Sequence, residues 1–227
     1  MTRRLLVLRP EPGASATVRA AEALGWQAAR APLFTTSACE WLPADPAILD
    51  AVLMTSANAA RLGGGGLAPL FHLPLYAVGA ATAQAARAVG FADVRAGDKD
   101  ASAIVALAAE QGMGRLLHLA GRDYHDARHP GVTIERRIVY RADRVERLPR
   151  PALAALELGA VALVHSPRAG RLFADLVDEA MLVRSAIRIA AISPAAMNGA
   201  GRGWLCAITA DVPNDLALLA AAARLCE

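Results

Sequence analysis

The stretch that decides the fold is Ala51-Val52-Leu53-Met54-Thr55-Ser56-Ala57-Asn58-Ala59-Ala60-Arg61. Its apolar run stops at two hydroxyl residues, and a run compatible with a helix follows, which predicts a buried strand, a tight turn and a helix N-terminus. The same order returns at Val161-Ala162-Leu163-Val164-His165-Ser166-Pro167-Arg168. Proline is well tolerated in the first helical turn, where the missing N–H is not needed. Two copies of one strand–turn–helix unit suggest that the chain repeats a single plan.

The composition favours helices packed on parallel strands. Of the 227 residues, 55% are hydrophobic and 20% charged, so material for a core is ample and bulk disorder is excluded. Aromatic residues make up only 4%, while small and branched aliphatic residues are abundant, as in parallel sheets covered by helices. The net charge of +3 suits an acidic ligand but is too small and too diffuse to indicate a nucleic-acid partner.

The cysteines and the N-terminus indicate a cytoplasmic protein. Cys39, Cys206 and Cys226 are odd in number and form no CxxC pair, which is typical of reduced thiols. The apolar run Leu5–Leu8 is too short for a signal peptide or a membrane span and is interpreted as the first strand. No membrane partner is therefore expected.

Strands and helices alternate along the whole chain, and some of them match one another. The segment Tyr76–Ala83 matches Ile189–Ala196. The next unit, Arg115–Arg122, has its counterpart at the beginning of the chain, in Arg3–Arg9. In the same way Trp26–Thr35, expected to be a single strand, mirrors Val132–Arg141. A match that is displaced in this way indicates that one unit has been inserted into the other.

We therefore predict an α/β fold of two similar domains, each a five-stranded parallel sheet flanked by helices, of flavodoxin type. Residues 1–36 plus 146–227 form the first, discontinuous domain, and residues 37–145 form the inserted one. The chain crosses near 33–39 and 139–146, and these crossings could pair as a two-stranded β ribbon. The alternative is one large doubly wound sheet.

In open α/β sheets the ligand crevice lies beyond the carboxyl ends of the strands, where helices begin and present unpaired N–H groups. Two such edges facing a shared cleft would offer main-chain donors to carboxylates. The residues expected at these strand ends, and predicted to bind substrate or to assist catalysis, are Arg9, Thr55, Ser56, Asn58, Gly79, Thr82, Gly121, Arg122, Ser166 and Ser193. Each has a simpler interpretation, because the hydroxyl residues can cap helices and the arginines can be solvated.

Other chemical signals are weak. His125 and His129 have the i, i+4 spacing of a helical metal pair but lack an acidic or cysteine partner, so no metal is expected. The run Gly63–Gly66 lacks the Lys-Ser/Thr of a phosphate-binding loop, and no GxGxxG follows the first strand. No Ser–His–Asp or Cys–His set can be assigned from spacing. The sequence predicts a binding cleft without a nucleophile and without a cofactor.

Five motifs in a fixed order carry a resemblance to a known family: Thr55-Ser56-x-Asn58-Ala59, Val78-Gly79-x-x-Thr82-Ala83, Leu119-x-Gly121-Arg122, Val139-Tyr140 and Ser166-Pro167. Together they resemble uroporphyrinogen-III synthase over nearly the whole chain. The resemblance implies two α/β domains joined by a two-stranded β-ladder, the first of them discontinuous. It also implies an enzyme that needs no cofactor and acts on a small-molecule substrate. We expect this enzyme to be a monomer.

The implied reaction is the cyclisation of hydroxymethylbilane, a linear tetrapyrrole with acetate and propionate arms, with inversion of ring D and loss of water. Loss of the hydroxyl gives a reactive azafulvene. The enzyme must therefore mainly hold the linear tetrapyrrole in the correct conformation and exclude water. The resemblance gives Tyr140 the role of a proton donor to the departing hydroxyl, and Thr82 a place in the catalytic set.

The sequence departs from the family pattern in two places. At Ser193-Pro194-Ala195-Ala196 the family often carries a hydroxyl where Ala196 stands, and His165 replaces a threonine. A hydroxyl network in the first domain is therefore in question. The alternative function is a non-catalytic, two-domain binder or sensor of an acidic small molecule.

Overall fold

The computed structural model describes residues 3–124 and 126–226. Its strands are β1 (Arg4–Val7), β2 (Gln27–Arg30), β3 (Phe34–Ala38), β4 (Ala51–Met54), β5 (Leu75–Val78), β6 (Val94–Gly97), β7 (Arg115–Gly121), β8 (Thr133–Arg144), β9 (Val161–Val164), β10 (Arg188–Ala191) and β11 (Cys206–Thr209). Its α-helices are α1 (Gly13–Ala23), α2 (Ala57–Leu62), α3 (Ala80–Val89), α4 (Ala101–Glu110), α5 (Arg150–Glu157), α6 (Pro167–Glu179), α7 (Pro194–Ala200) and α8 (Asp215–Arg224). Three short 3₁₀ helices, η1 (Pro46–Ile48), η2 (Gly64–Leu70) and η3 (Arg184–Ala186), complete the described elements.

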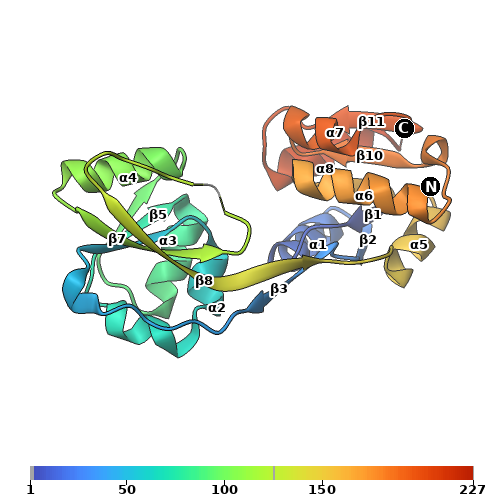
Figure 1. Ribbon diagram of the computed structural model, residues 1–227. Coiled ribbons are helices and arrows are strands. Elements are labelled where there is room, and N and C mark those ends of the chain that lie inside the picture. The colour runs from blue at the N-terminus through green and yellow to red at the C-terminus, as the bar shows by residue number, and fades with distance from the viewer. Residues whose placement is uncertain (1–2, 125, 227) are drawn as a thin grey trace. The chain divides into compact units, whose positions relative to one another are not determined.

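The strands form two separate sheets. One has the order β11-β10-β9-β1-β2, and the other has the order β3-β8-β7-β4-β5-β6. The first sheet is parallel at each of its pairings, and so are the pairings from β8 to β6 in the second. The prediction of an α/β fold with parallel sheets flanked by helices is confirmed, and Figure 1 shows the helices packed around the strands.

The predicted strand number is correct for the first sheet and wrong for the second, which has six strands. The segment Trp26–Thr35, expected to be one strand, contains the whole of β2 and the start of β3. The break falls around Pro32, which has no N–H to donate to a ladder. Beyond it the chain resumes as β3, and this strand is the added sixth member beside β8.

Contacts between Cα atoms divide the chain into two compact units. The first unit comprises the described residues up to Thr35 and those from Arg144 onward, and the second unit is Thr36–Asp143. Among the described residues, no helix combines the length and the apolarity needed to cross a bilayer.

The first unit has a core on each face of its sheet because successive strand residues point to opposite sides. Leu6, Ala162 and Ile189 pack on α5, α6 and α7, whereas their neighbours Leu5 and Val161 pack on α1 and α8. Both faces are therefore covered, as a parallel sheet requires.

The second unit follows the same rule. Val52 and Met54 of β4 join a core with residues of α2 and α3, while Ala51 and Leu53 pack on the other face against α4. All four side chains are fully buried. The continuous apolar run that opened the sequence is thus a central strand buried on both faces.

Helices α6 and α7 approach each other closely through two glycines. A Cβ on Gly199 would lie 2.6 Å from Cα of Pro167, and one on Gly170 would lie 2.7 Å from the backbone N of Ala200. These neighbours are backbone atoms, which cannot move aside as a flexible side chain can. The two glycines therefore set the spacing between the helices that follow β9 and β10.

We predict that Gly199→Ala lowers the free energy of unfolding by about 1–3 kcal/mol, although alanine is normally the better helix former. The added methyl must push α7 away from the first turn of α6. Urea denaturation measures the change. Gly65→Ala is the matched control, because a Cβ there meets nothing within 4 Å. Equal midpoints for the two variants would contradict the close approach.

Candidate active site

The second unit gathers most of the predicted site residues at one edge of its sheet. Met54 at the end of β4 pairs in parallel with Ala77 of β5 and with Leu119 of β7. This register aligns the carboxyl ends of the three strands, so the residues that follow them share an edge. The predicted residues at or just beyond this edge are Thr55, Ser56, Asn58, Gly79, Thr82, Gly121, Arg122 and, on β8, Tyr140.

Tyr140 rests on the backbone of Gly121. The ladder between β7 and β8 shifts register at the Ala120–Gly121 step, and Gly121 pairs with Tyr140. A Cβ on Gly121 would lie 2.5 Å from Cζ and 2.7 Å from the hydroxyl oxygen of the tyrosine. An irregularity of this kind turns a side chain out of the regular alternation. It leaves Tyr140 partly buried beside Val139, with its hydroxyl at the carboxyl end of β7.

Thr55 does not cap α2 but is hydrogen-bonded to a histidine that sequence reasoning did not select. Its Oγ1 lies 3.2 Å from Nε2 of His118, a fully buried residue of β7. The other ring nitrogen, Nδ1, accepts a hydrogen bond of 3.3 Å from Nε of Arg136. The threonine is thus tied to side chains of two neighbouring strands.

The His118 ring is neutral at neutral pH. Burial, and to a smaller degree the positive charge of Arg136, lower the pKa of His118 to about 4. Asp126 acts in the opposite direction, with less effect. The ring can therefore act as one donor and one acceptor, and Arg136 occupies the acceptor.

Three predicted serines cap helices, as their simpler interpretation had it. Oγ of Ser56 accepts from the backbone N of Asn58 at 3.2 Å, that of Ser166 from Ala169 at 3.1 Å and that of Ser193 from Ala196 at 3.2 Å. Each hydroxyl stabilises the first turn of the helix that follows a strand. Their Oγ atoms are used as acceptors in the chain itself.

Helix α3 begins differently. Gly79 occupies its N-cap position with φ +81° and supplies no side-chain acceptor. Positive φ is readily adopted by glycine, which explains the residue type at this turn. Thr82, in the first turn, is buried at 5% exposure. The start of α3 therefore presents backbone N–H groups without a side-chain cap, a suitable arrangement for an anionic oxygen.

In the first unit, the structure pairs Arg9 with an acid instead of leaving it solvated. Its Nη1 donates to both carboxylate oxygens of Asp215, at 3.0 and 3.2 Å. Oγ1 of the fully buried Thr17 donates to the same carboxylate at 2.7 Å. The charge of Arg9 is therefore largely balanced within the chain, which weakens its case as an anion-binding residue.

His165, which replaces the family's threonine, adjoins the same carboxylate. Its Nε2 lies 3.5 Å from Oδ1 of Asp215, too long for a strong hydrogen bond, and its side chain is 5% exposed. Among the described residues, neither ring nitrogen has a hydrogen-bond partner. The neighbouring His165, Thr17 and Arg9 together lower the pKa of Asp215 to about 2.

The remaining predicted residues lie nearer the surface. Arg122 is exposed, with Nη1 3.8 Å from Oδ1 of Asp143, and its backbone N donates to the carbonyl of Tyr140. Asn58 accepts a 3.5 Å hydrogen bond from Arg61. The predicted site residues thus fall into two groups. One is on the second sheet, and the other, formed by Arg9, Ser166 and Ser193, is on the first.

The histidine pair considered for a metal finds no support in the part of the chain that the structure describes. His125 lies outside the described residues, and Nδ1 of His129 accepts from the backbone of Gly131 at 3.3 Å. Among the described residues, no group of three or more His, Cys, Asp or Glu side chains is placed to hold a metal ion.

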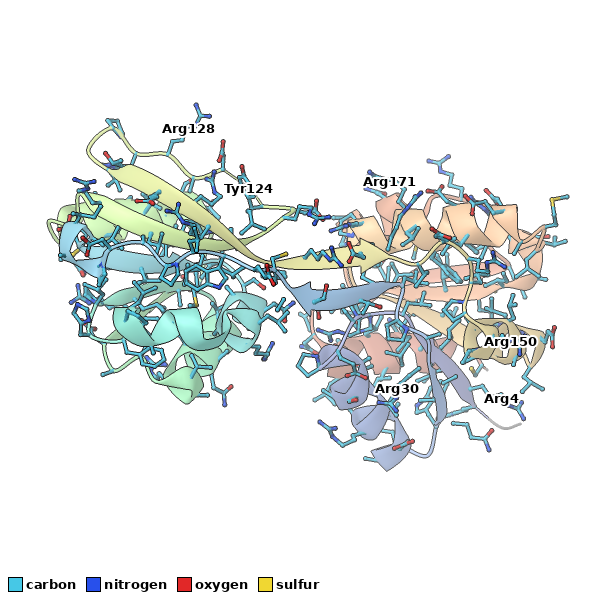
Figure 2. The ribbon with its side chains drawn as sticks, turned by 60° about the horizontal axis from the view of Figure 1, so that its bottom comes forward. Arg4, Arg30, Tyr124, Arg128, Arg150 and Arg171 are labelled. Carbon is cyan, nitrogen blue, oxygen red and sulfur yellow. The ribbon has the colours of Figure 1, made fainter. Side chains whose placement is uncertain are left out.

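A shallow, arginine-rich cavity of about 170 Å³ lies in the first unit. Its lining is formed by Phe34, Arg144, Arg168, Arg171, Leu172 and Asp175. Arg168 stacks over Phe34 at 4.4 Å, and Figure 2 shows Arg171 projecting from α6. The excess of guanidinium groups suits an acidic ligand.

The two residue groups that sequence reasoning missed differ in how detectable they were. His118 is a titratable residue inside the apolar run Leu116–Leu119, and such a buried histidine needs partners. That pattern was available as a signal. The contact of Thr17 with Asp215 joins residues 198 positions apart, and no local sequence pattern predicts it.

Comparison with known proteins identifies the family of this chain. The family model "HEM4: Uroporphyrinogen-III synthase HemD" matches residues 15–220. The solved structure of uroporphyrinogen-III synthetase from Helicobacter pylori 26695 is similar with a TM-score of 0.66 and 16% identity, over 99% of this chain and 100% of that one. A mutant uroporphyrinogen III synthase from Thermus thermophilus gives 0.52 and 18%, over 98% of each chain. No curated protein sequence matches significantly.

At these identities the structural likeness establishes the fold alone, and the family rests on the sequence model. That model spans nearly the whole chain, including both strand–turn–helix repeats. The chain belongs to the uroporphyrinogen-III synthase family.

Proposed function

We propose that this chain closes hydroxymethylbilane, a linear tetrapyrrole, to uroporphyrinogen III with inversion of ring D and loss of water, a lyase reaction of porphyrin and haem biosynthesis. The observation that carries the proposal is the family match over residues 15–220. The chemistry at the edge of the second sheet agrees with it. Hydroxyl groups and an uncapped helix start face a common edge there, as a substrate with many carboxylates requires.

The reaction asks the protein for placement more than for strong acids or bases. When the C–O bond of the hydroxymethyl group breaks, the hydroxyl leaves with a proton as water, and the azafulvene that remains is reactive enough to close unaided. Left alone, it closes onto the free carbon of ring D. The protein must hold the substituted carbon nearer and exclude water, so that this carbon forms the new bond. The older bond from the same carbon to its methylene bridge must then break and re-form at the free carbon, which loses its proton, and this inverts ring D. The reaction involves no net oxidation or reduction, and we propose that neither a metal nor a cofactor takes part.

Within this reaction, Tyr140 is our candidate for the proton donor to the departing hydroxyl. Its hydroxyl lies at the carboxyl end of β7, over Gly121. The backbone N–H groups at the start of α3, with Thr82 in its first turn, and the exposed Arg122 are the candidate ligands of the acetate and propionate arms. A phenolic hydroxyl can donate a hydrogen bond to a leaving oxygen.

We further propose that the two compact units are two flavodoxin-like domains, with β3 and β8 as the ribbon through which the chain passes between them. Both unit boundaries fall within these strands, which are neighbours in the sheet. We propose that the protein acts as a monomer in the cytoplasm, without a nucleic-acid or membrane partner. The free thiols of its three cysteines and the small net charge support this assignment.

Turnover tests the proposed function directly. The purified protein is mixed with freshly generated hydroxymethylbilane, and the porphyrin isomers are separated after oxidation. We expect the type III isomer to predominate with protein and the type I isomer without it. Type I product at the uncatalysed rate would favour the alternative, a protein that binds an acidic small molecule without converting it.

We predict that Tyr140→Phe slows turnover by roughly 100-fold, toward the lower end of what proton donation is worth, because the substrate is intrinsically reactive. The ring that rests on Gly121 is kept, so unfolding and product binding should change little. Single-turnover kinetics with isomer analysis measure the effect. Tyr124→Phe is the matched control. If Tyr140→Phe showed the wild-type rate and the wild-type isomer ratio, Tyr140 would be a packing residue and not a proton donor.

We propose that Asp215 acts mainly on stability, through its contacts with His165, Thr17 and Arg9. The folded-state pKa of Asp215 is about 2, below its ordinary value of 3.8, so its stabilising effect is complete above about pH 4 and is lost as the pH falls towards 2. Because the pair is partly exposed, we expect Asp215→Asn to cost about 1–2 kcal/mol at pH 7.

Urea denaturation at several pH values measures this difference. The gap between wild type and Asp215→Asn should narrow between pH 4 and pH 2. Asp211→Asn, at an 83% exposed side chain, is the control and should show no such gap. A gap that stays constant down to pH 2 would refute the assignment.

A further inference from the structure

The side chains of Arg136, His118 and Thr55 form a hydrogen-bonded network that ends at the edge of the proposed site. Arg136 of β8 donates from Nε to Nδ1 of His118 on β7 at 3.3 Å, and Nε2 of His118 lies 3.2 Å from Oγ1 of Thr55 after β4. The parallel registers bring these positions side by side, since His118 pairs with both Arg136 and Leu53.

The direction of each hydrogen bond in this network follows from the chemistry of Arg136. A guanidinium can only donate, so Nδ1 of His118 must accept. The ring is neutral, and its proton therefore resides on Nε2. Nε2–H donates to Oγ1 of Thr55, which leaves the threonine's own proton free to point elsewhere. Among the described residues, Thr55 has no further side-chain hydrogen bond.

The network is fixed by further contacts at the end opposite Thr55. His118 is fully buried, and Nη2 of Arg136 donates to Oδ1 of Asp126 at 2.8 Å. The guanidinium also lies over the ring of Tyr124, 3.9 Å from its centroid, and Figure 2 shows Tyr124 beside β8. An alternative tautomer of His118 would set two N–H donors against each other at Nδ1.

We propose that His118 is a positioning residue that makes the Thr55 hydroxyl an obligatory donor toward an anionic oxygen of the substrate. With a lone pair of Oγ1 engaged by Nε2–H, the hydroxyl proton is directed outward, and Thr55, at intermediate exposure, presents it at the strand edge. A carboxylate of an acetate or propionate arm is the acceptor that such a donor selects. This inference rests on the proposed function for the identity of the ligand.

The test is a double-mutant cycle on turnover of hydroxymethylbilane. Thr55→Val and His118→Phe should each lower kcat/KM by ~5–10-fold, mainly through KM, which is the loss expected for one oriented hydrogen bond. If His118 acts through Thr55, the double variant is no worse than the poorer single variant. Effects that multiply in the double variant would overturn the positioning role.

Conservative variants separate positioning from packing. Thr55→Ser keeps the hydroxyl and His118→Gln keeps an N–H near the place of Nε2, so both should retain activity within ~2–3-fold of wild type. His72→Phe, at an exposed histidine of the same unit, is the matched control and should leave kcat/KM unchanged. Loss in His118→Gln equal to that in His118→Phe would contradict the donor role.

A readout without substrate keeps the inference testable if a core variant fails to fold. Long-range ¹H–¹⁵N spectra of ¹⁵N-histidine-labelled protein report the tautomer of His118, and we expect the Nε2–H form. In Arg136→Met, at a side chain 23% exposed, this preference should weaken. An Nδ1–H form in the wild type would overturn the inference. Failure of the wild type to cyclise the substrate, with the Nε2–H form present, would instead overturn the proposed function and the identity of the ligand.

Discussion

The parallel pairing of β4 with β5 and β7 is the constraint on which the second unit depends. Four buried apolar residues, Ala51–Met54, fix β4 in the middle of the sheet with a helix layer on each face. Once that strand is placed, its register determines which residues emerge at the carboxyl edge. Polar groups with no partner in the core can then only gather at that edge, where Thr55 and the start of α3 lie. The position of the proposed site is thus a consequence of packing, and its proposed chemistry depends on a few residues at that edge.

The two units solve the same problem with different chemistry. Behind Thr55, the second unit has a neutral histidine whose acceptor nitrogen is satisfied by Arg136. At the corresponding strand end of the first unit, His165 sits beside a carboxylate that Arg9 and Thr17 already hold. The first edge therefore carries an internal ion pair, whereas at the second edge our proposal directs the hydroxyl of Thr55 outward. The doubt that the sequence raised about a hydroxyl network in the first unit agrees with this difference.

Much of the fold was predictable because strand–turn–helix repeats are local patterns, and the run Ala51–Arg61 contains one complete unit. The break between β2 and β3 was not predicted, because Trp26–Thr35 is a nearly continuous β-rich segment interrupted only by Pro32, and the residues after Pro32 pair with β8 and not with β1. The edge positions of Thr55, Gly79 and Gly121 came from the same local reasoning. The partners of those residues did not, because His118 and Arg136 meet through sheet register, and Asp215 reaches Arg9 from the far end of the chain.

The close packing of the Tyr140 ring on Gly121 also has an evolutionary consequence. Because the ring occupies the space of the missing Cβ, the two positions are complementary in size. A lineage that gains any side chain at position 121 must displace the ring or replace Tyr140 by a smaller residue, so the phenol is either moved or lost. The two positions should therefore change together among homologous sequences. A homologue with a larger residue at the glycine position could not keep the phenol where it lies in this chain.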